Sequence, residues 1–137
     1  MGLERFITAQ EKMYDQALRE IQNGRKQTHW MWFVFPQIAG LGHSATAKFY
    51  SIVNLEEAEG YLAHPVLGKH LVEISEELLK IEGKSVNAIF GTPDDMKLRS
   101  SMTLFANTTS APPVFKKVLD KYFSGFPDPQ TLKRLQQ

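Results

Sequence analysis

Apolar side chains recur with helical spacing over residues 3–21. The stripe comprises Leu3, Phe6, Ile7, Ala17, Leu18 and Ile21, a spacing that places them on one face of a helix. Gln10 and Tyr14 fall within the same stripe, and we expect this polar pair to be satisfied by hydrogen bonds in the core. Asn23 and Gly24 follow, and residues of these types typically end a helix.

The same periodicity, together with start and stop signals, predicts six further helices. They cover residues 54–62, 65–81, 85–90, 92–106, 114–123 and 128–135. Asn54 and Glu57 form a capping-box pattern, and Pro65 suits the first turn of the helix that follows it. Thr92 is the predicted N-cap of its helix, with Pro93 at the first helical position.

One apolar run, residues 30–35, has no period. Its sequence is Trp-Met-Trp-Phe-Val-Phe, and pattern alone does not distinguish a buried strand from a buried helical turn. Because helices are predicted on both sides and no partner strand is apparent, we interpret the run as a buried turn. The sequence therefore predicts an all-α fold, a compact bundle of about six to eight helices, in a single domain over residues 1–137.

Composition narrows the possible functions. The chain has 137 residues, a net charge of +1 and no cysteine, which excludes disulfides and thiolate metal sites. The small net charge argues against extended binding to nucleic acid, where affinity grows with the number of neutralised phosphates. The four histidines lack metal-site spacing, so neither a metal nor another cofactor is expected. No apolar run reaches the length of a membrane span, and we expect a cytoplasmic protein that does not bind membranes.

The first segment with possible chemistry surrounds the aromatic run. His29, Trp30, Trp32 and Gln37 lie there, just after the basic pair Arg25-Lys26. Aromatic faces beside cations suit a nucleobase, which stacks, and a phosphate, which pairs with positive charge. The alternative is that the tryptophans and phenylalanines only fill the core.

The second segment is the helix over residues 92–106. Lys97, Arg99, Ser101 and Thr103 lie beside its apolar positions and could hold a phosphate or a ribose. Asp95 could act as a general base if it borders a cleft. The alternative is a capped surface helix whose charges pair with one another.

Three segments resemble the domain of unknown function 1810 family. They are residues 29–37, 61–68 and 90–105, and the resemblance extends from residue 3 to about residue 135. The resemblance implies a small, mainly helical protein of a family without an established activity, some of whose members carry the label calpastatin by automatic naming.

A weaker resemblance, from Lys97 through Met102 to Tyr122, Phe123 and Leu132, is to the NADAR family. It implies chemistry on NAD or ADP-ribose with cleavage of N-glycosidic bonds. The Trp-Gly segment of that family is absent here.

Two functional hypotheses follow. In the first, residues 30–37 and the Lys97–Thr103 face enclose a pocket for a nucleotide-like or ADP-ribose-like ligand, and an N-glycoside hydrolase could use Asp95. In the second, the chain is a non-catalytic module that docks a protein partner through residues 30–37. The sequence leaves the oligomeric state open.

Overall fold

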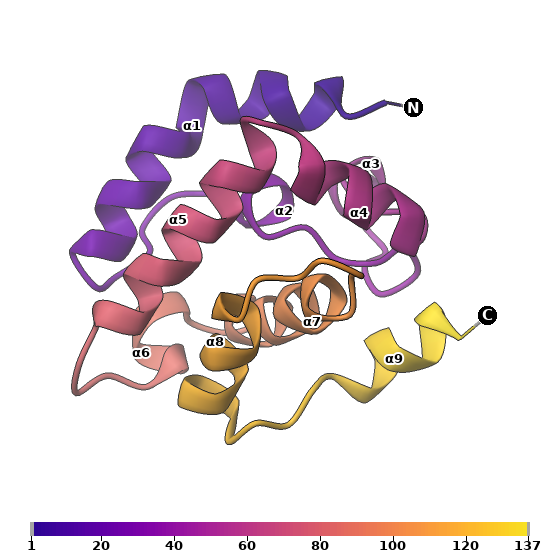
Figure 1. Cartoon of the computed structure of the whole chain (residues 1–137). Coiled ribbons are helices and arrows are strands. Elements are labelled where there is room, and N and C mark those ends of the chain that lie inside the picture. Colours follow the sequence, from indigo (N-terminus) through magenta and orange to yellow (C-terminus); the bar gives the residue numbers. More distant parts are fainter. Residues whose placement is uncertain (1, 137) are drawn as a thin grey trace.

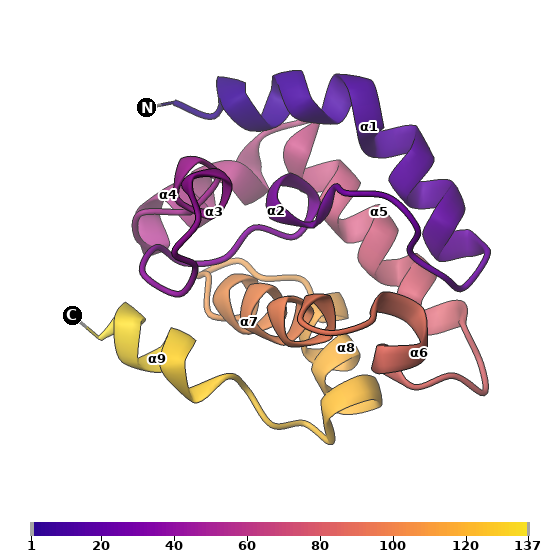
Figure 2. The ribbon, with the colours of Figure 1, turned by 180° about the vertical axis from the view of Figure 1, so that it is seen from behind.

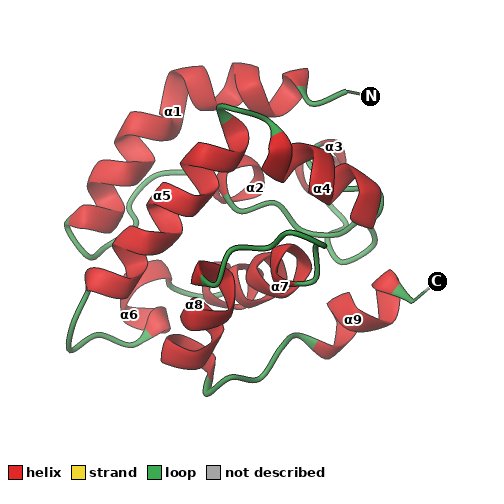
Figure 3. Cartoon of the chain, in the orientation of Figure 1, coloured by secondary structure: helices red, strands yellow, loops and turns green. Residues whose placement is uncertain are grey.

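The computed structural model describes residues 2–136, and this part of the chain forms nine helices and no strand. The all-α prediction is therefore confirmed (Figure 3). The helices are α1 (Glu4–Gln22), α2 (Met31–Val34), α3 (Ala45–Phe49), α4 (Leu55–Ala63), α5 (Leu67–Lys80), α6 (Val86–Phe90), α7 (Asp94–Ala106), α8 (Val114–Phe123) and α9 (Pro129–Leu135). The division into one domain over residues 1–137 stays a prediction.

The predicted apolar stripes form the core. Helix α5 packs against α1, α4 and α8, and α7 packs against α4, α6, α8 and α9 (Figure 1). The largest fully buried side chains come from α1, α4, α7 and α8 and from the two ends of α2, and they include Phe6, Trp30, Phe35, Tyr61, Phe105 and Phe115. The run at residues 30–35 forms the buried turn that was expected, with α2 at its centre.

Gln10 and Tyr14 are satisfied inside the core, as expected. The Gln10 amide donates to the Phe33 carbonyl at 2.7 Å and to the Tyr61 hydroxyl at 2.8 Å. The Tyr14 hydroxyl donates to Glu73 Oε1 at 2.6 Å. Burial, followed by this hydrogen bond, raises the pKa of Tyr14.

Two helix starts differ from their predictions. Helix α5 begins at Leu67 with Val66 as its N-cap, so Pro65 lies in the preceding turn rather than in the helix. Helix α7 has Pro93 as its N-cap and no side-chain cap. The Thr92 hydroxyl instead accepts from the Asn87 side-chain amide at 2.9 Å and donates to Asp95 Oδ2 at 3.4 Å. It therefore bonds to side chains and does not cap the helix.

Helix α3 has no counterpart among the predicted elements. None of its residues is buried, so it leaves no apolar stripe for a periodicity search to find. Ser44 caps it by accepting from the Ala47 amide. Seen from behind (Figure 2), α3 and α2 lie beneath α1. Across residues 2–136 we find no helix long and apolar enough to cross a membrane.

Candidate functional site

Trp30 belongs to the core. Its side chain is 0% exposed, and its indole N–H donates to Glu20 Oε1 at 2.9 Å. One face is covered by the Lys26 ammonium, 5.1 Å from the ring centroid. Trp30 therefore has no free face on which a base could stack, and four of its five neighbours in the run, Met31, Phe33, Val34 and Phe35, are also buried.

Trp32 and Lys97 do come together, as the sequence hypothesis required. The Lys97 ammonium lies 5.2 Å from the Trp32 ring centroid and 3.8 Å from Asp94 Oδ1. Trp32 and Gln37 border the same hollow, but its volume is about 10 Å³. This is about the space of one water molecule, so no nucleotide fits between these side chains.

The other α7 residues that the sequence proposed as ligand contacts are Arg99, Ser101 and Thr103, and all three serve the fold. Arg99 donates from Nε to the Phe126 carbonyl at 3.0 Å and from Nη2 to the Pro127 carbonyl at 2.8 Å. Thr103 Oγ1 accepts from the Asp128 amide at 2.8 Å and donates to the Arg99 carbonyl. Ser101 is fully buried, and its hydroxyl has no hydrogen-bond partner among the described residues. Arg99 and Thr103 thus fasten the segment that leads into α9.

Replacing Thr103 with valine tests this structural role. The change keeps the side chain's shape and leaves the Asp128 amide without an acceptor, so we expect a loss of about 1–2 kcal/mol in the free energy of unfolding. Urea denaturation measures this loss. Thr46→Val, at an exposed position of α3, is the control and should change stability by less than ~0.5 kcal/mol. An unchanged Thr103→Val variant would contradict the assignment.

Asp95, the predicted general base, is buried in the first turn of α7. Its carboxylate accepts from the Met96 amide at 2.8 Å and from the Asn87 side chain at 3.1 Å. It does not border any of the hollows described below. These contacts give Asp95 a structural role at the N-terminus of α7. A carboxylate there is also stabilised by the positive end of the helix dipole.

A hollow of about 620 Å³ lies between α1 and the segments of α2 and α3; we call it the α1–α3 pocket. One wall is aromatic. The Tyr50 ring centroid lies 5.3 Å from that of Phe33 and 4.8 Å from that of Phe49. Phe33 is 7% exposed, whereas Phe49 is 46% exposed, so an open aromatic edge faces the hollow.

The opposite wall is the polar face of α1. It contributes Glu4, Thr8 and Lys12 at intervals of four residues, and Ala9 and Met13 lie next to Thr8 and Lys12 in the chain. His29 also lines the pocket, as the one predicted site residue that does. Glu4, Lys12 and His29 are all exposed. Among residues 2–136, neither Glu4 nor Lys12 forms an ion pair.

Arg5 holds the two walls together. Its Nε donates to the Phe49 carbonyl at 2.8 Å, and its Nη2 donates to the Ser51 carbonyl at 2.9 Å. Its ion-pair partner is Glu57, at 3.4 Å. The Arg5 guanidinium is buried, and these contacts satisfy it. It therefore positions the aromatic wall and does not offer a free positive charge to the hollow.

The sequence contained a faint signal of this pocket. Glu4, Thr8 and Lys12 form a polar stripe opposite the apolar stripe of α1, but such a stripe is usually a solvated surface. Phe49 is the last residue of α3, the helix that the periodicity did not reveal, and Tyr50 is its C-cap. The pocket was missed because its two walls come from separate parts of the chain, residues 4–13 and residues 29–50.

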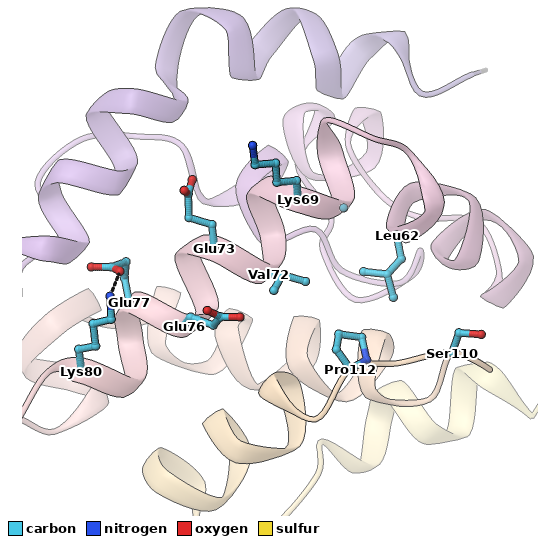
Figure 4. Close-up of a pocket in the computed structure, with 10 residues that line it drawn as sticks. Leu62, Lys69, Val72, Glu73, Glu76, Glu77, Lys80, Ser110 and Pro112 are labelled. Atoms are coloured by element: carbon cyan, nitrogen blue, oxygen red, sulfur yellow. Dashed lines mark hydrogen bonds and ion pairs between the residues drawn. The ribbon is translucent and has the colours of Figure 1, made fainter.

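A second hollow, of about 710 Å³, follows the outer side of α5 (Figure 4). Leu62, Val72 and Pro112 supply its apolar part. Glu77 is paired with Lys80 at 2.6 Å, and Glu73 is held by Tyr14. The structure thus accounts for two of the carboxylates there. Nowhere in residues 2–136 do three histidine, aspartate or glutamate side chains gather as a set of metal ligands.

Comparison with known proteins places the chain in a family. The family described as "Protein of unknown function (DUF1810)" matches residues 1–135. The conserved hypothetical protein Rv1873 from Mycobacterium tuberculosis, known from a crystal structure, is 47% identical to this chain. That match covers 98% of this chain and 96% of the other, with a TM-score of 0.96.

No curated protein matches the chain. The weaker NADAR resemblance and the calpastatin label gain no support from these comparisons, whereas the main resemblance is confirmed over nearly the whole length. The chain therefore belongs to the DUF1810 family of proteins of unknown function.

Proposed function

We propose that the α1–α3 pocket binds a small ligand that joins a planar ring to an anionic group, as a nucleotide does. The observation that carries this proposal is one hollow of about 620 Å³ lined by three aromatic rings and two exposed basic side chains. Pockets for small ligands commonly have volumes of about 300–1,000 Å³. The ligand class is the one expected from the sequence, whereas the site differs.

The aromatic wall supports stacking of a planar ring. Phe49 is 46% exposed although it belongs to a cluster with Tyr50 and Phe33. Its neighbours hold the ring on one side while the other remains accessible. Stacking of a base on an aromatic side chain contributes about 1–3 kcal/mol, which makes Phe49 the main expected contact.

The basic side chains support binding of an anion. Lys12 and His29 line the pocket, and Lys12 has no carboxylate partner among the described residues. A phosphate or carboxylate on the ligand would be held by the Lys12 ammonium, with His29 as a hydrogen-bond partner. Since Lys12 is exposed, this attraction would weaken as salt is added.

We propose binding rather than hydrolysis as the activity of this pocket. Asp95, the carboxylate expected to assist N-glycoside cleavage, is held by Asn87 and the Met96 amide at the start of α7. The competing hypothesis of a protein-docking module needs an exposed aromatic run at residues 30–37, but most of that run is buried. Small-molecule binding is therefore the better-supported function.

Two single variants test the proposal. Calorimetry would measure the affinities of AMP, GMP, NAD, ADP-ribose, ribose 5-phosphate and inorganic phosphate for the wild type. Phe49→Ala is expected to lower the affinity for ligands that contain a base by about tenfold, because it removes one stacking surface. Lys12→Gln is expected to lower the affinity for every ligand that carries a phosphate by about three- to fivefold at low salt.

Matched variants keep the test specific. Lys97→Gln probes the site first expected from the sequence, and Lys117→Gln changes an exposed charge on α8; neither should alter affinity. Chromatography of NAD and ADP-ribose after incubation would detect any released base. Unchanged affinity in both Phe49→Ala and Lys12→Gln would refute the proposed site. A loss of affinity in Lys97→Gln would place the ligand site beside α7 instead.

A further inference from the structure

We infer that Glu4 determines which ring the α1–α3 pocket accepts, selecting a ring edge with two adjacent hydrogen-bond donors, such as that of guanine. This inference rests on the proposed function. It starts from the position of Glu4 among the lining residues, at the opposite end of the α1 wall from Lys12.

The two charged groups define a direction in the pocket. Glu4 and Lys12 are eight residues apart on one helix, which corresponds to ~12 Å along its axis. Thr8 and Ala9, both small, lie between them on the same wall. An anionic group is attracted to Lys12 and repelled by Glu4, so the ring of a bound ligand points toward Glu4 and its phosphate toward Lys12 and His29.

The Glu4 carboxylate lies beside Gly2, at the end of the pocket where α1 begins, and no cation of the described residues pairs with it. Arg5, its neighbour in the chain, is engaged by Glu57 at 3.4 Å and by the carbonyls of Phe49 and Ser51. Glu4 is exposed and forms no ion pair among the described residues. Its charge is therefore not neutralised within the part of the chain that the structure describes.

A carboxylate selects among rings because it only accepts hydrogen bonds. Guanine presents N1–H and the N2 amino group side by side, so both carboxylate oxygens receive a donor. Hypoxanthine keeps N1–H but lacks the amino group. Adenine has an amino group next to the N1 lone pair, which repels a carboxylate. Paired contacts to a base edge discriminate more strongly than single ones.

The test compares three nucleoside monophosphates by calorimetry. We expect the wild type to bind GMP about tenfold more tightly than IMP or AMP. In Glu4→Gln, where one oxygen becomes an amino donor, GMP should lose about tenfold in affinity and AMP less than about twofold. Glu11→Gln, an exposed acid of α1 that does not line the pocket, should leave all three affinities unchanged.

The outcomes separate this inference from the proposed function. If the wild type binds none of the three nucleotides, the proposed function fails. If the wild type binds all three equally, or if Glu4→Gln lowers all three affinities by the same factor, the selection by Glu4 is refuted while the pocket stands. Thermal unfolding of Glu4→Gln confirms that the variant is folded, as its exposed position predicts.

Discussion

Replacing Gly68 with alanine is expected to lower the free energy of unfolding by about 3 kcal/mol or more. Gly68 lies in the first turn of α5 and is buried against the end of α4. A Cβ atom there would stand 1.9 Å from the Leu62 carbonyl oxygen and 2.8 Å from the Leu62 carbonyl carbon. Because these are backbone atoms, no side-chain rotation relieves the clash, and the two helices must move apart.

Gly60→Ala is the matched control and should have the opposite sign. Gly60 is exposed on α4, and a Cβ atom at that position meets nothing within 4 Å. Alanine favours a helix over glycine by about 0.5–1 kcal/mol, so we expect a gain of that size. Urea denaturation of both variants measures the two effects. A Gly68→Ala variant as stable as wild type would show that the junction between α4 and α5 is not closely packed.

The second large effect is expected at Glu20, a carboxylate that is 3% exposed. It accepts from five donors: the Gln27 amide, the Thr28 amide, the Thr28 hydroxyl, the Trp30 indole and the Gln16 side chain. Glu20→Ala leaves several of these donors buried without an acceptor, at a cost of about 1–3 kcal/mol for each one fully deprived of water. We therefore expect a total loss of at least ~3 kcal/mol, measured by urea denaturation.

Acid should reproduce part of this loss in the wild type. Burial acts to raise the pKa of Glu20, but the hydrogen bonds from Thr28, Gln27 and Gln16 outweigh it and lower that pKa to about 2, from 4.5 in an unstructured chain. A lowered pKa means that the folded state binds the proton less readily than the unfolded state. The stabilisation of about 3 kcal/mol is then complete above pH 4.5 and is lost as the pH falls toward 2.

Two variants separate the charge of Glu20 from its shape. Glu20→Gln keeps the size and one acceptor oxygen, so it should be less destabilising than Glu20→Ala and should lack the acid-dependent loss. Glu11→Ala, at an exposed position of the same helix, should stay within ~0.5 kcal/mol of wild type. A Glu20→Gln variant with the wild-type pH dependence would assign that dependence to other carboxylates.

Local signals in the sequence predicted most of the helices. The apolar spacing of α1 and α5 is long and regular, and the caps Asn54, Ser85 and Asp128 each accept from the backbone amide three residues further on. Such features depend on the chain's immediate neighbours and can be recognised without a fold. Helix α3 escaped prediction because it buries none of its residues.

The candidate site could not be predicted in the same way. Whether Trp30 faces a ligand or the core depends on Glu20, which supplies an acceptor for its indole N–H. Whether Thr103 touches a ribose or the chain itself depends on Asp128, 25 residues away. In both cases the residue type suits either role, and the partner that decides between them is brought close only by folding.

The sequence by itself determined the all-α class, the order of the main helices and the family, because periodicity, caps and long matching segments are properties of the chain. Only the tertiary structure decided where a hollow remains between the packed segments. It filled the space around Trp32 and Gln37 and left the α1–α3 pocket open. The physical reason is that a cavity is the space that packing leaves between distant segments, and no local pattern encodes that space.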